Sequence, residues 1–176
     1  KIILKKLNFS YFDDSLNTLS HKIKTSSKIE DIIQLHFDEK WIYNSYISKY
    51  INIEPNKTEL IEFLVLIMKK TKKKLIITSG KHKPKILKDI NLAIGRLNIE
   101  IYNNLSFSEL ENITLRSKIL ISCHGAISHI ASAHNIKQVD IIDINNLNPY
   151  SIWTDHFRNY YPLYRKDFSL LSKEIY

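Results

Sequence analysis

Cysteine and glycine are scarce in this chain of 176 residues, which contains one cysteine and three glycines. The single thiol, Cys123, excludes an internal disulfide and fits a reducing compartment. No apolar run is long enough to span a bilayer, and no signal-peptide pattern opens the chain. Because the chain begins at Lys1 rather than at methionine, we expect the natural protein to begin upstream of it.

Arginine is rare as well, since only four of the 26 basic residues are arginine in a chain with a formal net charge of +8. Isoleucine and asparagine are abundant, a bias typical of an AT-rich genome. Bidentate contacts to phosphates and bases are usually made by arginine, so the lysine excess favours a solvated surface over a nucleic-acid footprint. We therefore predict no specific nucleic-acid partner. A basic α/β domain that binds nucleic acid remains an alternative.

Short apolar runs alternate with helical patterns through the middle of the chain. Strands are expected at 30–37, 74–78, 99–102, 119–121 and 139–142, with helices at 58–71, 84–97, 107–117 and after residue 125. This alternation predicts an α/β fold, with a Rossmann-like, mostly parallel sheet and helices on both faces. A hydrophobic content of 44% suits one core, and we place the domain at 29–147.

Helix starts can be read at three positions. Thr58 is the expected N-cap of the first helix, which ends in lysines as the helix dipole prefers. Pro84 suits the first turn of the second helix. Ser106 followed by Glu109 matches a capping box and predicts the start of the third.

The two ends of the chain depart from the alternating pattern. Residues 1–28 are expected to be a linker or the remnant of an upstream segment. Residues 148–176 are expected to be an aromatic segment of helical pieces packed on a core, and base stacking in a nucleic-acid protein is the alternative. Its aromatic residues recur at threes and fours, interrupted by Pro162: Trp153, Phe157, Tyr160, Tyr161 and Tyr164.

The segment 119–143 carries most of the chemistry, because a polar turn and a short helix separate two buried strands. The turn contains His124 and Gly125. A diphosphate can bind at such a turn through the backbone N–H groups of Gly125, Ala126 and Ile127 at the helix N-terminus. His124 can add an imidazole donor. We therefore predict a phosphate site here.

The histidines of this segment do not predict a metal site. His124, His129 and His134 are five residues apart at each step, so they do not share one helical face. His129 stays open between contact with a ligand and a hydrogen bond to a neighbouring carbonyl. Cys123 is expected to be a small packing residue rather than a nucleophile.

Two further turns should lie at the same edge of the sheet, because the carboxyl ends of parallel strands share one edge. Lys40 and Trp41 follow the first predicted strand, and Gly80 and Lys81 follow the second. Lys40 is either a donor contact or a stem lying over the indole, and the basic loop at Lys81 is either a phosphate contact or a solvated loop.

The order of these motifs over residues 29–143 resembles the carboxyl-terminal half of a GT-B glycosyltransferase, and in particular the heptosyltransferases of lipopolysaccharide synthesis. Members of that family carry Lys-Trp or Lys-Arg-Trp after the first strand of this half. After a later strand they carry Asp-Ser/Thr-Gly-x-x-His-x-Ala-x-Ala. The residues that match are Lys40, Trp41, Gly125, His129, Ala131 and Ala133.

Three departures from the family pattern fall within the turn. Cys123 stands where the family has an acidic residue, and His124 stands where it has a small hydroxyl residue. His129 lies one residue farther from Gly125 than the family's histidine does.

The resemblance implies a donor-binding half that transfers a sugar from a nucleotide sugar to a glycan or lipid-linked acceptor, without a metal or a cofactor. It implies Lys40 and His124 as catalytic groups that stabilise the leaving diphosphate. The implied donor contacts are Gly125, Ala126, Ile127, Ser128, His129, Gly80, Lys81 and Trp41.

The resemblance also implies partners and a location. An upstream GT-B N-terminal domain would supply the base for the acceptor hydroxyl. Residues 148–176 would be an aromatic C-terminal helical brace whose faces meet that partner domain. The location would be cytoplasmic, with contact at the inner face of a bacterial inner membrane. A non-catalytic nucleotide-sugar or phosphate-binding module of the same fold is the alternative.

Overall fold

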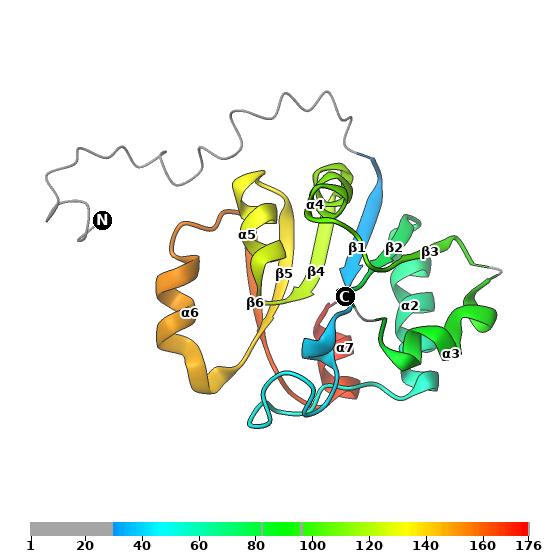
Figure 1. The fold of residues 1–176 in the computed structure, drawn as a ribbon, viewed down its shortest axis with the longest axis horizontal. Coiled ribbons are helices and arrows are strands. Elements are labelled where there is room, and N and C mark those ends of the chain that lie inside the picture. The colour runs from blue at the N-terminus through cyan, green and yellow to red at the C-terminus, as the bar shows by residue number, and fades with distance from the viewer. Residues whose placement is uncertain (1–29, 82, 96, 176) are drawn as a thin grey trace, which may run out of the picture.

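In the computed structural model, which describes residues 30–81, 83–95 and 97–175, six parallel strands form one sheet (Figure 1). The strand order is β3-β2-β1-β4-β5-β6, so the chain builds outward from β1 in one direction and then in the other. The strands are β1 (Ile32–His36), β2 (Lys74–Thr78), β3 (Ile99–Tyr102), β4 (Ile119–Cys123), β5 (Lys137–Ile142) and β6 (Tyr160–Tyr164). The α/β fold with a Rossmann-like parallel sheet is confirmed.

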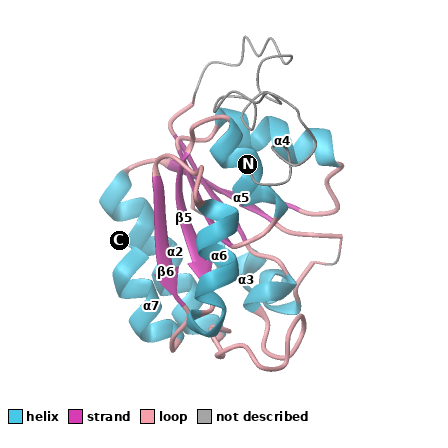
Figure 2. Ribbon diagram, turned by 90° about the vertical axis from the view of Figure 1, so that its left-hand side faces the viewer, coloured by secondary structure: helices cyan, strands magenta, loops and turns pink. Residues whose placement is uncertain are grey.

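Helices cover both faces of the sheet (Figure 2). One face packs against α2 (Lys57–Thr71), α3 (Lys85–Ile94) and α7 (Phe168–Ile175). The other face packs against α4 (Phe107–Arg116) and α5 (Ala126–Ala133), and α6 (Leu147–Thr154) follows β5. Among the described residues, no helix is both long and apolar enough to cross a bilayer.

Strand alternation divides the core between these two layers. Ile33 and Leu35 of β1 point into the larger cluster beneath α2, α3 and α7, where both side chains are almost fully buried. Leu120 of β4 joins the smaller cluster beneath α5. Successive side chains of a strand face opposite layers, so buried strands such as these read as continuous apolar runs in the sequence.

Two of the predicted helix starts hold and one is displaced. Ser106 caps α4, and the capping box with Glu109 is present. Pro84 is the N-cap of α3. The predicted cap at Thr58 is wrong, because Asn56 caps α2 and forms a capping box with Glu59. The asparagine side chain accepts from the third backbone N–H, which leaves Thr58 inside the first turn.

The prediction of helical pieces throughout the aromatic segment is wrong at β6. Residues Tyr160–Tyr164 pair with β5 as the last strand of the sheet, although α6 and α7 on either side are helical. Pro162 lies in this strand opposite Asp140. An edge strand tolerates proline because one side of its backbone needs no partner, and its half-exposed side chains lack an apolar strand pattern. The predicted linker 1–28 lies outside the described residues.

Candidate functional site

The carboxyl ends of β1 and β4 meet at the point where the strand order changes direction, and two of the predicted site residues lie together there. Lys40 follows β1 and Gly125 follows β4. A Cβ atom on Gly125 would lie 3.0 Å from Nζ of Lys40, so the ammonium rests against the glycine backbone. Gly125 is extended, with φ of 178°, so close approach rather than conformation requires glycine here. Crevices at such a change of direction are the usual ligand sites of open parallel sheets.

Asp38 holds Lys40 in this position. Its carboxylate accepts from the backbone N–H of Lys40 at 3.1 Å and pairs with Nζ at 2.6 Å. Burial opposes charge on Lys40, but the attraction and hydrogen bond to Asp38 outweigh it, and the pKa of Lys40 lies above its ordinary value. The lysine is therefore a fixed cation beside the turn.

The N-terminus of α5 supplies the backbone half of the site. Ala126 is exposed at its first position, and the side chain of Ile127 is buried against the sheet, so Ile127 can offer only its N–H to a ligand. The N–H of Gly125 itself donates to Oγ of Ser128 at 3.3 Å. An anion at this helix end would meet the first-turn N–H groups and the ammonium of Lys40 together.

Ser128 has a different role from the predicted donor contact. Its side chain is fully buried, and Oγ donates to Asp140 at 2.8 Å while accepting from the turn. The hydroxyl of Ser128 therefore shapes the turn from inside, and the predicted donor contact of Ser128 stays a prediction without an exposed side chain to make it.

A row of polar side chains crosses the sheet one residue before the rim. Strand register places His36 opposite Thr78 on β2 and opposite Ser122 on β4, and Ser122 lies opposite Asp140 on β5. Nδ1 of His36 is 2.9 Å from the Thr78 hydroxyl. Burial lowers the pKa of His36 more than Asp38 raises it, which keeps the ring neutral. The polar row forms the floor beneath the turn that follows β4.

Asp140 anchors His124. Its Oδ2 lies 2.6 Å from Nδ1 of His124, and the carboxylate itself is fully buried. A carboxylate on one imidazole nitrogen orients the ring and selects which nitrogen faces outward. Cys123 carries no acid, and the carboxylate that bonds to His124 comes instead from the neighbouring strand β5. Asp140 was not identified from the sequence, although an aspartate within the apolar run of β5 already indicated a buried carboxylate.

His124 and His129 both contact rings of the C-terminal segment, although His129 remains exposed. The ring centroids of His124 and His129 are 5.5 Å apart, and His124 also lies 5.0 Å from Tyr150 and 6.2 Å from Trp153. Partial burial lowers the pKa of His129, and the neighbouring histidines lower it further. His129 thus joins an aromatic cluster at the side of the rim.

Gly80 lies on the same rim, two strands away from Gly125. A Cβ atom on Gly80 would lie 3.3 Å from Oε2 of Glu39, the residue before Lys40, so the loops after β1 and β2 are in close approach. Lys81, next in the chain, is exposed. The rim therefore carries Lys40, Gly80 and Gly125, but only Lys40 and Gly125 are shown in contact.

Trp41, which was predicted to contact the donor, does not lie at the rim surface in this structure. Its side chain is fully buried, stacks on Phe37 with ring centroids 5.1 Å apart, and donates from Nε1 to the carbonyl of His36 at 2.8 Å. The indole fills the space beneath the loop that carries Lys40. It positions the lysine by packing.

Arg165 was not identified from the sequence. It follows β6 and is buried, and the part of the chain that the structure describes gives its guanidinium no carboxylate partner. It donates to the carbonyls of Lys40 at 2.9 Å and of Ile51 at 3.0 Å, and it lies over the ring of Tyr50. The loop after β1 is therefore tied to the C-terminal segment by a buried cation.

Among residues 30–81, 83–95 and 97–175, no three histidine, cysteine, aspartate or glutamate side chains gather in a way that could hold a metal ion. His134 caps the C-terminus of α5 and faces Glu111, with Nε2 and Oε1 3.6 Å apart.

Solved structures share this arrangement of strands and helices. E. coli heptosyltransferase WaaC, solved with ADP-2-deoxy-2-fluoro heptose, superposes with a TM-score of 0.58 at 14% identity, over 98% of this chain and 52% of that one. The Methanocaldococcus jannaschii UDP-GlcNAc 2-epimerase, solved in complex with UDP-GlcNAc and UDP, superposes with a TM-score of 0.56 at 11% identity. The superposition covers 93% of this chain and 44% of the epimerase. This chain has the fold of half a GT-B protein.

The likeness is one of fold. The chain spans about half the length of the proteins it matches, 52% of WaaC and 44% of the epimerase. No protein-family model matches the chain, and no curated protein matches it in sequence. One of the two neighbours is a transferase and the other an epimerase, so the fold alone does not select a reaction.

Proposed function

We propose that this chain is the donor-binding half of a glycosyltransferase that uses a nucleotide sugar. The observation that carries the proposal is the contact between Lys40 and Gly125. A fixed ammonium, a glycine that admits close approach and the N-terminus of α5 converge at one point of the rim. Two negatively charged phosphates need this combination of cation and backbone donors.

The proposed reaction is displacement at the anomeric carbon. The bond from that carbon to the diphosphate oxygen breaks, and its electron pair stays on the diphosphate. The acceptor hydroxyl oxygen forms the new bond and gives its proton to a base of the other GT-B half. Lys40 and the α5 N-terminus meet the charge that develops on the leaving group, with His124 beside them as a donor held by Asp140.

The finer assignments follow from the resemblance to heptosyltransferases. The acceptor would be a glycan or a lipid-linked saccharide such as lipopolysaccharide, made at the cytoplasmic face of a bacterial inner membrane. The side chains named above would supply the charge stabilisation without a resident cofactor.

Nucleotide binding tests this function. Isothermal titration with ADP, GDP, UDP and their sugars should show binding of at least one nucleoside diphosphate. Lys40→Met should weaken it by about ten- to hundredfold, the loss of one charge-assisted hydrogen bond. Lys118→Met is the matched control, because Lys118 is exposed just before β4, at the opposite edge of the sheet. Absence of binding to every nucleotide, or equal weakening by both variants, would rule out the site.

A non-catalytic nucleotide-sugar-binding module is the second candidate, and one observation favours it. Cys123 is fully buried beside Arg165, and burial raises the pKa of its thiol, so neither a carboxylate nor a thiolate faces the rim at this position. Release of nucleoside diphosphate from a bound nucleotide sugar in the presence of a saccharide acceptor would separate a transferase from a module that only binds.

A further inference from the structure

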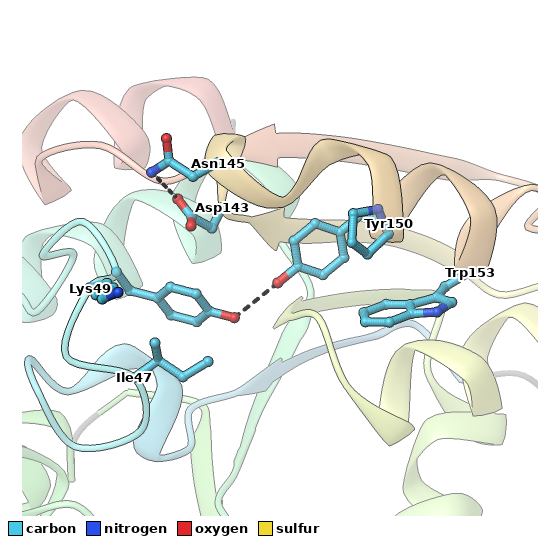
Figure 3. Close-up of a pocket in the computed structure, with 8 residues that line it drawn as sticks. Ile47, Lys49, Asp143, Asn145, Tyr150 and Trp153 are labelled. Atoms are coloured by element: carbon cyan, nitrogen blue, oxygen red, sulfur yellow. Dashed lines mark hydrogen bonds between the residues drawn. The ribbon is translucent and has the colours of Figure 1, made fainter.

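A second concave feature lies beside the phosphate turn, between the loop after β1 and the start of α6. It is a pocket of about 480 Å³, which is within the size range of small-molecule sites (Figure 3). Tyr50 and Ile47 come from the loop, Asp143 and Asn145 from the segment between β5 and α6, and Tyr150 and Trp153 from α6.

Two aromatic rings form a corner in this pocket. Trp153 is 52% exposed, and its indole lies nearly parallel to the ring of His124, with centroids 6.2 Å apart. The Tyr150 ring stands at 89° to the indole, with centroids 5.8 Å apart, and the hydroxyls of Tyr150 and Tyr50 are 3.1 Å apart. An apolar corner of this kind can pack against the C–H face of a puckered ring.

Polar groups face the same space as the rings. The Asp143 carboxylate is only 2% exposed and accepts from Nδ2 of Asn145 at 3.3 Å, as Figure 3 shows. Burial, followed by the hydrogen bond to Tyr50, raises the pKa of Tyr150, which keeps the phenol protonated and able to donate. The pocket therefore offers a carboxylate, an amide and hydroxyls around an apolar face.

The pocket adjoins the phosphate site through shared residues. Tyr150 lies 5.0 Å from the ring of His124, and Tyr50 lies under the guanidinium of Arg165, which bonds to the carbonyl of Lys40. A group attached to a diphosphate at Gly125 would lie within reach of this corner.

We propose that this pocket binds a sugar ring. A pyranose has an apolar face of C–H groups, which packs on an aromatic face, and hydroxyls around its edge that both donate and accept. Trp153 and Tyr150 provide the apolar corner, and Asp143 with Asn145 provides partners for the hydroxyls. The assignment rests on the proposed function for its link to a donor. The ring itself could belong to the donor or to a saccharide acceptor, which share this chemistry.

Saturation-transfer NMR with methyl glycosides at millimolar concentration tests the pocket directly. Glycoside ring protons should receive saturation, and Trp153→Ala and Asp143→Asn should each weaken binding by about tenfold, the loss of one such contact. Phe107→Ala is the control, since Phe107 is 63% exposed at the start of α4 and does not line the pocket. Fluorescence offers a second readout, because Trp41 is buried in the core and Trp153 would report the ligand.

Nucleotides separate the two sources of the ring and the two proposals. If the ring belongs to the donor, the nucleotide sugar binds more tightly than the matching nucleoside diphosphate, and Trp153→Ala removes only that gain. If it belongs to the acceptor, glycosides still bind when nucleotide sugar is saturating. Glycoside binding without nucleotide binding would keep the sugar pocket and end the donor proposal. Binding of free nucleosides in place of glycosides, binding of neither, or equal weakening of nucleotide and nucleotide sugar by Trp153→Ala would overturn the sugar assignment.

Discussion

Replacing Gly125 with alanine should separate ligand binding from folding at the rim. The added Cβ would lie 3.0 Å from Nζ and 3.4 Å from Cε of Lys40, where ordinary contacts lie at 3.4–4 Å. The backbone of Gly125 is extended, so alanine adopts it without strain. The clash is with the end of a flexible side chain, and we expect the free energy of unfolding to change by less than about 1 kcal/mol.

The retreat of Lys40 sets the expected loss of affinity. To reach ordinary contact, Nζ must move away by about 0.5–1 Å. With an effective dielectric constant of about 20, an ammonium about 3 Å from a phosphate oxygen gains about 5.5 kcal/mol, falling to about 4.7 at 3.5 Å and about 4.2 at 4 Å. The difference, about 0.8–1.4 kcal/mol, corresponds to about four- to tenfold weaker binding.

Isothermal titration with the best nucleoside diphosphate measures this loss, and urea unfolding measures stability in parallel. Gly95→Ala is a suitable control, because Gly95 is exposed at the end of α3 in a right-handed helical conformation. Combining Gly125→Ala with Lys40→Met should add little to the lysine variant alone, since both act through one ammonium. Unchanged affinity, full additivity of the two substitutions, or a loss of affinity matched by a loss of stability would refute the reasoning.

Three further predictions concern the floor and core of the site. Asp140→Asn should lower the free energy of unfolding, measured in urea, by about 1–3 kcal/mol, because the buried hydroxyl of Ser128 and the ring of His124 lose a charged acceptor. An unchanged midpoint of urea unfolding would show that these hydrogen bonds to Asp140 add no stability. Stability should fall as pH drops through about 6.5, since burial lowers the pKa of His36 in the fold and the unfolded chain therefore binds the proton first. Urea unfolding at several pH values should show that the free energy of unfolding depends less steeply on pH in His36→Gln. An identical pH dependence in the two proteins would exclude His36 as the source of the effect. Trp41→Ala should cost about 3–5 kcal/mol as a buried indole is removed, measured by urea unfolding, and a near-neutral result would contradict its place in the core.

The parts of the site that could be read from the sequence are local. The strand before Gly125 and the helix after it follow from a short apolar run, a glycine and an alanine-rich segment, all within neighbouring residues. The meeting of Lys40 with Gly125 was expected only because parallel strands end at one edge. The contact between their atoms depends on β1 and β4 being adjacent, and that adjacency is a property of the strand order.

Residues that were misplaced or missed depend on partners far away in the chain. Trp41 carries an apolar ring and one polar atom, and both surface and core are compatible with its sequence neighbours; the carbonyl of His36 and the ring of Phe37 place it inside. Arg165 looks like an ordinary surface cation until β6 carries it beneath the loop after β1. No local pattern indicates that a cation will be buried.

The sequence by itself determined the class of fold, five of the six strands and the turn that an anion can approach, because periodicity, capping residues and glycine act over a few neighbouring positions. The tertiary structure alone decided the sixth strand, the polar row of His36, Thr78, Ser122 and Asp140, and the aromatic corner at Tyr150 and Trp153. Register and strand order bring these residues together across long stretches of chain, and they are selected by packing of the whole domain rather than by any one segment.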